Sequence, residues 1–418
     1  MKIINILSHI PQIEIHQYNN PLDYVKRFHE TEFIQINKEP YWVGFFKLDW
    51  HHQWGKYVKN LAPKLDVECW RPYGNTIDQV YEKNIDGLKH KVFPSTEFKI
   101  KKYGTIEHSR LMLEELKKEI QSNEVLIHIY GSHTSFIIWL LNKLKPNKTP
   151  IVLQHLGGGF FYFFAKYRKN PFLFLNYYFE KKSLKYVDYY LTASKIEEKF
   201  IIKKFPSLNF EFFLNGIDFG KFNLIEKKKA REMLGITNGG KILLYVGRFT
   251  SVKSVDKIIE VFKKLKQENG NIELFLVGGY ETDEFYNFAI DSGANVVLRS
   301  DESINIYFAA ADAYILPIND PIVQNFGGIG IASLESLAMN TPVISPNIIH
   351  VPEGCDVSKL GEVMELDNLF SQIKRVLTQK YVKTREIIQN HFDILKNSER
   401  LIKIYENVFN KYYTKSHF

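Results

Sequence analysis

Short runs of β-branched and aromatic residues alternate with longer stretches of helical period along most of the chain. This alternation is typical of an α/β protein with parallel sheets. In the first half the pattern predicts strands at 41–48, 67–71, 125–130, 150–154, 189–192 and 210–214, and helices at 55–65, 107–122 and 135–144. Residues 1–40 are interpreted as an N-terminal extension of uncertain structure before the main sheet.

The second half repeats the same rhythm. Strands are predicted at 241–246, 273–277, 295–298, 313–316 and 342–345, and helices at 255–267 and 331–339. The Lys-rich segment 215–240, with turn residues at both ends, is the expected junction between the halves. The pattern therefore predicts an N-terminal domain over 1–220, a C-terminal domain over 221–395, and a last segment, 396–418, that packs back on the first domain. Most of this last segment belongs to a helical run predicted at 387–411. Ligands of open α/β folds bind beyond the carboxyl ends of the strands, so we expect a crevice between the two sheets.

Length and composition fit this two-domain picture. A chain of 418 residues is too long for one ordinary core. Apolar residues make up 45% and charged residues 24%, as in an ordinary globular protein. No run of 18 uncharged apolar residues is present and the N-terminus does not read as a signal peptide, so a cytoplasmic protein is expected. The two cysteines, Cys69 and Cys355, fit no metal spacing and no disulfide framework.

The net charge of +8 favours anionic partners, such as a nucleotide diphosphate or an anionic lipid surface. A solvated Lys-rich surface explains most of these lysines equally well. Nucleic acid is not an expected partner, because no predicted helix carries a dense basic face with interleaved reading residues.

Two stretches carry the candidate chemistry. The strand 241–246 ends at Gly247, and two cations follow, Arg248 and Lys253. Cations at the carboxyl end of a strand suit a diphosphate. Further on, a glycine-rich turn that begins at Gly327 leads into a helix carrying Glu335, and an acid at a helix start suits a ribose diol. Together the two stretches predict a site for a nucleotide-sugar.

Several motifs, in order and at plausible spacing, resemble the retaining GT-B glycosyltransferases of family 4, also called glycosyl transferases group 1. The resemblance covers about residues 41–412. The landmarks are Leu191-Thr-Ala-Ser194, Asn215-Gly-Ile-Asp218, Gly247-Arg-x4-Lys253, Leu274-Phe-Leu-Val-Gly-Gly279, Ala310-Ala-Asp-Ala-Tyr-Ile-Leu-Pro317 and Leu334-Glu-Ser-Leu-Ala-Met-Asn-Thr-Pro-Val-Ile344. The resemblance implies two Rossmann-like domains whose parallel sheets face each other across a crevice. The first would bind the acceptor and the second the nucleotide-sugar.

The resemblance also implies roles for individual residues. Arg248 and Lys253 would bind the donor diphosphate and stabilise the leaving nucleotide, close to Gly247 and Gly278. Glu335 would accept hydrogen bonds from both ribose hydroxyls. The alternatives are a surface cation pair after a strand and an acid that stabilises its own helix. No metal is expected, because the two cations neutralise charge that a divalent ion would otherwise handle.

In the first half, His155 follows a predicted strand and precedes Gly157-Gly-Gly159. Its position in the family suggests a hydrogen bond to the transferred sugar or the acceptor, although a lone histidine is more often structural. His128 and His133 are weaker candidates for the same crevice. Gly55 is the candidate to replace the paired glycines that the family has near its first strand.

The chain departs from the family pattern at Gly327, where the family usually has a second glutamate. The stretch 317–335 is also some six residues longer than usual. Gly327 and Gly328 can still bring backbone N–H groups close to a sugar or phosphate. A polar contact to the donor sugar would then come from a residue of the longer stretch. The candidates are Asp320, Gln324 and Asn325.

The segment 160–182 combines aromatic residues with cations. This composition suits a bilayer interface or a lipid-linked acceptor. The charges and Pro171 exclude a membrane span. A helix pair that packs on the first sheet, with lysines reaching outward, is an equally good interpretation.

The function expected from these observations is transfer of a hexosyl group from a nucleoside-diphosphate sugar to the hydroxyl of a sugar or lipid-linked acceptor, with retention at the anomeric carbon. Cell-surface polysaccharide or glycolipid synthesis is the expected setting, peripheral on the inner face of the plasma membrane. Two alternatives share the fold. One is a catalytically inactive GT-B partner subunit, and the other is a sugar-nucleotide epimerase or phosphorylase.

Overall fold

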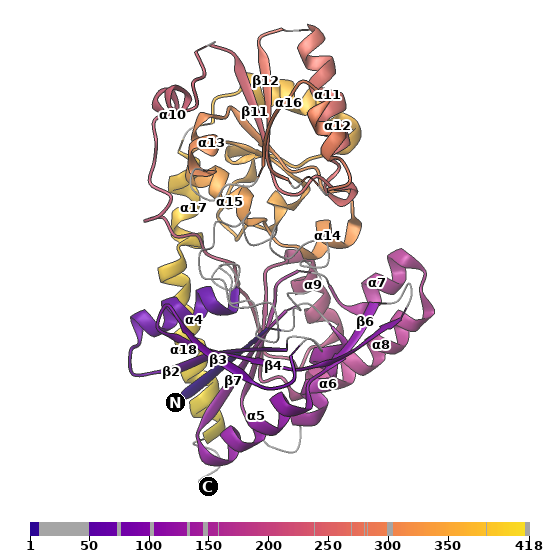
Figure 1. The fold of residues 1–418 in the computed structure, drawn as a ribbon, viewed down its shortest axis with the longest axis vertical. Helices are drawn as coiled ribbons and strands as arrows, with labels where there is room; N and C mark the ends of the chain where they lie inside the picture. The colour runs from indigo at the N-terminus through magenta and orange to yellow at the C-terminus, as the bar shows by residue number, and fades with distance from the viewer. Residues whose placement is uncertain are drawn as a thin grey trace. The chain divides into compact units, whose positions relative to one another are not determined.

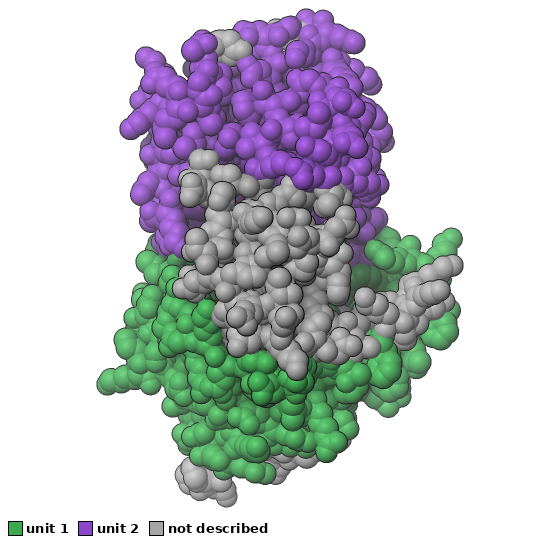
Figure 2. Space-filling view, viewed as in Figure 1, with its two compact units in different colours: residues 1–213, 395–418 green, residues 214–394 purple. Residues whose placement is uncertain are grey.

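The computed structural model describes residues 1–7, 50–72, 77–100, 104–131, 134–144, 149–157, 159–237, 239–268, 270–279, 281, 283–298, 304–381 and 383–413. The chain forms two compact units, coloured separately in Figure 2. Unit 1 comprises residues 1–213 and 395–418, and unit 2 comprises residues 214–394. The predicted strand at 41–48 lies outside the described residues.

Unit 1 is built on an eight-stranded sheet of order β10-β9-β8-β7-β1-β2-β4-β3 (Figure 1). Its strands are β1 (Lys2–Leu7), β2 (Asp66–Pro72), β3 (Tyr81–Ile85), β4 (Leu88–Phe93), β7 (Val125–Gly131), β8 (Ile151–His155), β9 (Tyr189–Thr192) and β10 (Phe210–Phe212). All neighbours pair in parallel except β3 and β4. A separate hairpin joins β5 (Thr96–Ile100) to β6 (Gly104–His108). The first-half pattern therefore predicted a mainly parallel sheet correctly, but it missed β3 to β6.

The two faces of this sheet differ in chemistry. One face carries an apolar core, in which Ile4, Ile6 and Trp70 pack with residues of α5 (Arg110–Ser122) and α6 (Ser135–Leu144). The same core includes residues of α9 (Lys195–Lys204). The other face is more polar and lies against α4 (Trp50–Leu61) and α18 (Ile394–Tyr413), where the Tyr405 hydroxyl lies 2.5 Å from His128 Nδ1.

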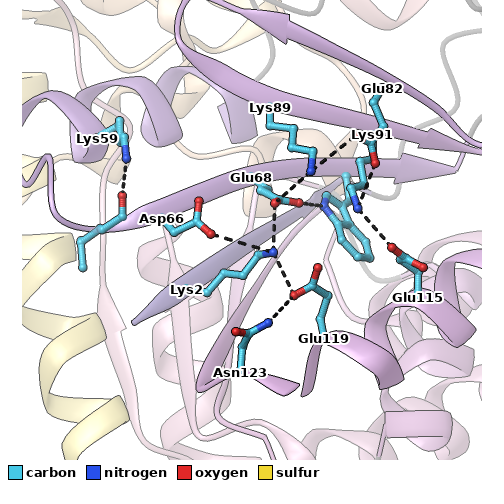
Figure 3. Close-up of polar contacts among 12 residues, drawn as sticks. Lys2, Lys59, Asp66, Glu68, Glu82, Lys89, Lys91, Glu115, Glu119 and Asn123 are labelled. Atoms are coloured by element: carbon cyan, nitrogen blue, oxygen red, sulfur yellow. Dashed lines mark hydrogen bonds and ion pairs between the residues drawn. The ribbon is translucent and has the colours of Figure 1, made fainter. Parts of the chain in front are cut away.

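The prediction that residues 1–40 form an extension before the sheet was wrong for Lys2–Leu7, which is a central strand between β2 and β7. Lys2 Nζ lies 3.0 Å from Glu68 and 2.9 Å from Glu119, so its charge is paired at the amino end of this central strand (Figure 3). The next residues are apolar or buried, as a strand covered on both faces requires.

Unit 2 contains a six-stranded, fully parallel sheet of order β13-β12-β11-β14-β15-β16. Its strands are β11 (Lys241–Val246), β12 (Ile272–Gly279), β13 (Asn295–Leu298), β14 (Ala313–Ile315), β15 (Val343–Ile344) and β16 (Gly361–Glu362). Counted from β11, this order is the 3-2-1-4-5-6 arrangement of a dinucleotide-binding domain. The chain runs to one side of β11 and then returns to the other, so the order reverses between β11 and β14. Open α/β sheets bind ligands beside such a switch point.

Helices cover both faces of this sheet (Figure 1). One group contains α11 (Val255–Glu268), α12 (Tyr286–Ile290) and α16 (Leu369–Thr378). The other contains α10 (Lys227–Met233), α13 (Ile304–Ala310), α15 (Ile331–Ala338) and α17 (Thr384–Phe392). The α/β fold with two predominantly parallel sheets is thus as predicted.

The helical run predicted at 387–411 is two helices, α17 and α18, separated at Asp393. Asp393 takes an extended conformation and forms a parallel β-bridge with Ile217. This bridge separates α17 from α18. The compact units change at 213/214 and at 394/395, so the chain passes between them twice.

Candidate functional site

Arg248 follows β11 and is held by an acid that the sequence did not single out. Its Nε and Nη2 donate to Asp283 Oδ1 at 3.0 and 2.8 Å. Asp283 is buried, and its other oxygen accepts a hydrogen bond from the backbone of Phe249 at 2.9 Å. The Arg248 side chain is 40% exposed. Asp283 therefore fixes the direction of the Arg248 side chain while part of it remains open to a ligand.

The chain needs glycine at the end of β11. Gly247 has φ +148°, a conformation that side chains disfavour, and its N–H bonds to Val277 of β12. Gly278, with φ +94°, lies directly beside it. These two glycines bring the ends of neighbouring strands together, just before the cations.

Lys253 ends a short 3-10 turn, Ser251–Lys253, on the way into α11. Burial lowers the pKa of its ammonium from the ordinary value. Within the described part of the chain, no hydrogen bond or ion pair involves this ammonium. A partly buried lysine without a counter-ion is costly on its own, and an anionic ligand would offset that cost.

Glu335 lies in α15, which follows the switch-point strand β14 and the short helix α14 (Pro321–Phe326). Burial raises the pKa of its carboxyl to about 7. Among the described residues, its carboxylate has no hydrogen-bond donor and no cation. Like Lys253, it is an ionisable group without a charged or hydrogen-bonded partner among the described residues.

The stretch between β14 and α15 contains a six-residue helix, α14. Asp320 is the N-cap of α14, accepting from the backbone of Ile322 at 2.8 Å. Gln324 donates to the Ile318 carbonyl at 2.6 Å. The Asp320 carboxylate and the Gln324 amide thus already support the loop, and Asn325 is a partly exposed residue of the same helix.

Gly327 ends α14, at the position where the resembled family has an acid. A Cβ added there would lie 2.5 Å from the Val323 carbonyl oxygen, closer than side chains tolerate. The helix geometry therefore explains the glycine without reference to a ligand. Gly328 follows with φ +63° and turns the chain toward α15.

In unit 1, His155 ends β8 and is buried. Its Nδ1 bonds to the Glu197 carboxylate, and its Nε2 accepts from the Gly159 N–H at 3.1 Å. Glu197 is fully buried and also accepts from the Thr192 hydroxyl at 2.6 Å. The histidine thus joins the glycine-containing turn after β8 to the start of α9. Its direct contact with a sugar stays a prediction.

The weaker candidates of unit 1 have other surroundings. His128 is buried on the polar face of the sheet against Tyr405. His133 lies outside the described residues. Gly55 lies inside α4, where a Cβ would meet Asn5 Nδ2 at 3.0 Å. Its lack of a side chain lets α4 approach the sheet closely.

One His/Cys group among the described residues has the spacing of a possible metal site. His51, Cys69 and His90 are buried, and their ligand atoms lie within 4.8 Å of one another. Sequence spacing could not reveal it, because α4, β2 and β4 each supply one residue. Burial lowers the pKa of both histidines, and the nearby positive charge of Arg71 lowers it further. That same charge opposes a bound cation.

Residues 226–390 match the family described as "Glycosyl transferases group 1". This part of the chain is similar to that family. It contains Arg248, Lys253 and Glu335, along with all six strands of the unit 2 sheet.

Curated proteins also match parts of the chain. The chain is 29% identical over 139 residues to the capsular polysaccharide biosynthesis glycosyltransferase CapM of Staphylococcus aureus, which covers 32% of this chain and 35% of that protein. It is 28% identical over 163 residues to the amylovoran biosynthesis glycosyltransferase AmsK of Erwinia amylovora, covering 38% of each. The chain thus spans little more than a third of the length of these two relatives. Protein CapJ of S. aureus matches 90% of the chain and 95% of its own length, at 22% identity.

Solved structures show the same fold over nearly the whole chain. Sucrose-phosphate synthase from Thermosynechococcus elongatus matches with a TM-score of 0.67 and 16% identity, over 98% of this chain and 100% of that one. Anabaena Alr3699/HepE in complex with UDP matches with a TM-score of 0.62 and 13% identity, over 97% and 100%. The chain therefore has the GT-B fold. None of the described helices is long and apolar enough to cross a membrane.

Proposed function

We propose that the protein transfers a hexosyl group from a nucleoside-diphosphate sugar to an acceptor hydroxyl, with retention at the anomeric carbon. The observation that carries this proposal is the pair of unsatisfied charges in unit 2. Lys253 and Glu335 follow neighbouring strands at the switch point, and neither has a charged or hydrogen-bonded partner among the described residues. One ligand that carries both an anion and a diol would satisfy both.

In this reaction Lys253 and Arg248 hold the donor diphosphate, and Glu335 accepts the ribose hydroxyls. The bond between the anomeric carbon and the diphosphate oxygen breaks, and a bond to the acceptor oxygen forms on the same face. The acceptor proton passes to the leaving diphosphate, so no protein base is required. The cations stabilise the negative charge that develops on the leaving group, the electrostatic effect that contributes most in many enzymes.

Proteins similar to this chain support the proposed donor class and setting. Anabaena Alr3699/HepE was crystallised with UDP-glucose, and the trehalose-6-phosphate enzyme from E. coli with UDP-2-fluoro glucose. CapM and AmsK are named for capsular polysaccharide and amylovoran biosynthesis. We therefore place the reaction in cell-surface polysaccharide or glycolipid synthesis, with a sugar or lipid-linked acceptor bound by unit 1 at the inner face of the plasma membrane.

A second function is favoured by one observation. Gly327 has no room for the acid that the family usually carries there, and Asp320 and Gln324 are bonded within their own loop. A partner subunit that binds donor without turnover would have the same features. A sugar-nucleotide epimerase or phosphorylase on the same fold is the remaining alternative.

Incubation of the protein with a panel of radiolabelled nucleotide-sugars distinguishes these functions. A transferase releases nucleotide in step with the formation of a glycosylated acceptor. An inactive partner binds a donor in calorimetry but releases no nucleotide with any acceptor extract. An epimerase converts the donor alone, and a phosphorylase requires phosphate. Failure of every donor to bind would refute all of these functions.

A further inference from the structure

We propose that α7 (Phe161–Arg168) and α8 (Pro171–Ser183) form an interfacial anchor that binds the surface of an anionic lipid bilayer. This inference gives the proposed membrane setting of the transferase a physical contact surface. It rests on the exposure, charge and packing of these two helices rather than on the donor site.

The two helices form a tight hairpin. Lys169 ends α7 in the left-handed conformation, with φ +48°. Asn170 then caps α8, and its side chain accepts from the Phe172 N–H at 3.0 Å. Pro171 occupies the first turn of α8, where its missing N–H costs nothing. The turn residues thus fix the two helices side by side.

One side of the hairpin is firmly attached to unit 1. Leu173 and Ala165 are buried, and Phe163 packs edge-on against Phe200 of α9, with 4.7 Å between ring centroids. Ser183 of α8 accepts a hydrogen bond from Asn142 of α6 at 2.7 Å. The hairpin is therefore a packed part of the fold, as one of the two sequence interpretations expected.

The opposite side of α8 exposes large apolar side chains, where a surface helix normally carries polar ones. The exposed residues and their exposed fractions are Phe172 (56%), Phe174 (46%), Leu175 (55%), Tyr178 (50%) and Phe179 (45%). At 100° per residue these five occupy one continuous face of the helix, opposite Leu173 and Glu180. A contiguous apolar face of this kind marks an interaction surface.

The charge of the hairpin indicates which kind of partner binds this apolar face. Residues 160–186 contain six basic residues and one acid, Glu180. Glu180 is buried and accepts from the Phe161 N–H at 3.0 Å, so its charge does not reach the surface. The cations lie among the exposed rings, with Lys182 Nζ 4.3 Å from the centre of the Tyr178 ring. An anionic bilayer complements this surface, whereas a second copy would bring like charges together.

The dimensions indicate how the hairpin would bind. The 13 residues of α8 extend about 20 Å, short of the roughly 30 Å hydrocarbon core, so the helix would lie in the interface and not span it. Phe172, Leu175 and Phe179 would enter the boundary between headgroups and acyl chains. Lys181, Lys182 and Lys185 would contact lipid phosphates. Aromatic and basic residues are enriched at this depth.

Vesicle sedimentation with the full chain, without donor or acceptor, tests the proposal. The protein should sediment with vesicles of phosphatidylcholine mixed with phosphatidylglycerol and much less with phosphatidylcholine alone, and high salt should release it. Lys181→Ala with Lys182→Ala should weaken binding roughly 30-fold, since each lysine near an anionic surface contributes about fivefold. The matched control, Lys228→Ala with Lys229→Ala on exposed α10, removes the same charge from unit 2 and should have little effect.

A second pair of variants tests the apolar face. Phe172→Ser with Leu175→Ser should weaken vesicle binding at least roughly tenfold. Met233→Ser with Ile290→Ser, two similarly exposed apolar residues of unit 2, should not. Circular dichroism establishes that each variant is folded. The proposal is overturned if the unmodified protein does not sediment with anionic vesicles at low salt, or if both α8 variants bind as it does. It is equally overturned if the apolar variants instead abolish a dimer in sedimentation equilibrium.

Donor binding, measured by calorimetry on the same preparations, separates this inference from the proposed function. The α8 variants should bind donor as the unmodified protein does, because α8 belongs to unit 1 and the donor groups to unit 2. Vesicle binding without any donor binding would refute the nucleotide-sugar function and leave the anchor intact. Donor binding without vesicle binding would refute the anchor and leave the nucleotide-sugar function intact.

Discussion

Arg248 donates two hydrogen bonds to a single oxygen of Asp283, from Nε at 3.0 Å and from Nη2 at 2.8 Å. The acid is buried and 35 residues away in the chain, on the loop after β12. Its second oxygen holds the backbone of Phe249. Asp283 thus connects the two strand ends between which the donor diphosphate would lie, and it directs the guanidinium.

We expect Asp283→Ala to lower the free energy of unfolding by about 2–3 kcal/mol, because it leaves a buried N–H without an acceptor and a guanidinium without its partner. Turnover should fall roughly tenfold beyond any loss of folded protein, because Arg248 is no longer held in one direction. Urea denaturation and steady-state kinetics measure the two effects. Asp283→Asn, which keeps one acceptor oxygen, should recover part of the stability. If kcat is unchanged in the alanine variant, Asp283 does not position Arg248 for the reaction.

The strands of unit 2 could be predicted closely from the sequence, because they lie in a parallel sheet that is covered on both faces. β11 and β13 have the predicted bounds, because parallel strands are short apolar runs with polar residues at each end. β1 was missed because an asparagine, Asn5, interrupts its apolar run. Asp283 could not be found either, since nothing in its local sequence shows that a loop brings it to Arg248. The length of the stretch 317–335 was apparent, but its folding into α14 was not.

Lys253→Ala and Arg248→Ala should each lower turnover by roughly 10²-fold, as loss of an electrostatic donor to a developing charge does. The folded state should survive Lys253→Ala, because the ammonium has no described partner and its burial lowers its pKa. Nucleotide release from the donor measures the effect. Lys257→Ala is the matched control, since Lys257 lies one turn further on and, among the described residues, its ion pairs are with acids on its own helix. If both Arg248→Ala and Lys253→Ala turn over at the wild-type rate, the two cations do not take part in the reaction.

Donor affinity should depend on the ionisation of Glu335. Burial raises the pKa of its carboxyl to about 7, and hydrogen bonds from ribose hydroxyls favour the charged form. Affinity should therefore increase as the pH rises through 7, with release of a proton on binding. Calorimetry in buffers of different ionisation enthalpy measures this release. Glu335→Gln should bind donor more weakly at pH 8 and lose the pH dependence around 7. If Glu335→Gln keeps the pH dependence of donor affinity around 7, another ionisable group causes that dependence.

The same carboxyl should weaken the fold. Because the folded-state pKa lies above the ordinary value of 4.5, the folded protein binds more protons than the unfolded chain between pH 4.5 and 7. The contribution of Glu335 to stability therefore falls as the pH rises through this window. Partial exposure screens the charge, so we expect Glu335→Gln to raise the free energy of unfolding by about 1–2 kcal/mol at pH 8 and to change it little at pH 4. Denaturation at both pH values measures this difference. If Glu335→Gln changes the free energy of unfolding equally at pH 8 and pH 4, this expectation is wrong.

Restoring an acid at position 327 should not restore a donor contact. A Cβ at Gly327 would lie 2.5 Å from the Val323 carbonyl oxygen and 3.3 Å from Asn347 Nδ2, so the end of α14 must shift to admit any side chain. We expect Gly327→Ala and Gly327→Glu both to lower the free energy of unfolding by about 1–3 kcal/mol, the usual cost of overpacking. Gly239→Ala is the control, because no atom lies within 4 Å of the added Cβ there. Urea denaturation measures stability, and nucleotide release measures turnover. If Gly327→Glu folds as stably as the unmodified protein and turns over faster, then α14 is adaptable, and the glycine reflects a lost catalytic acid and not the geometry of this loop.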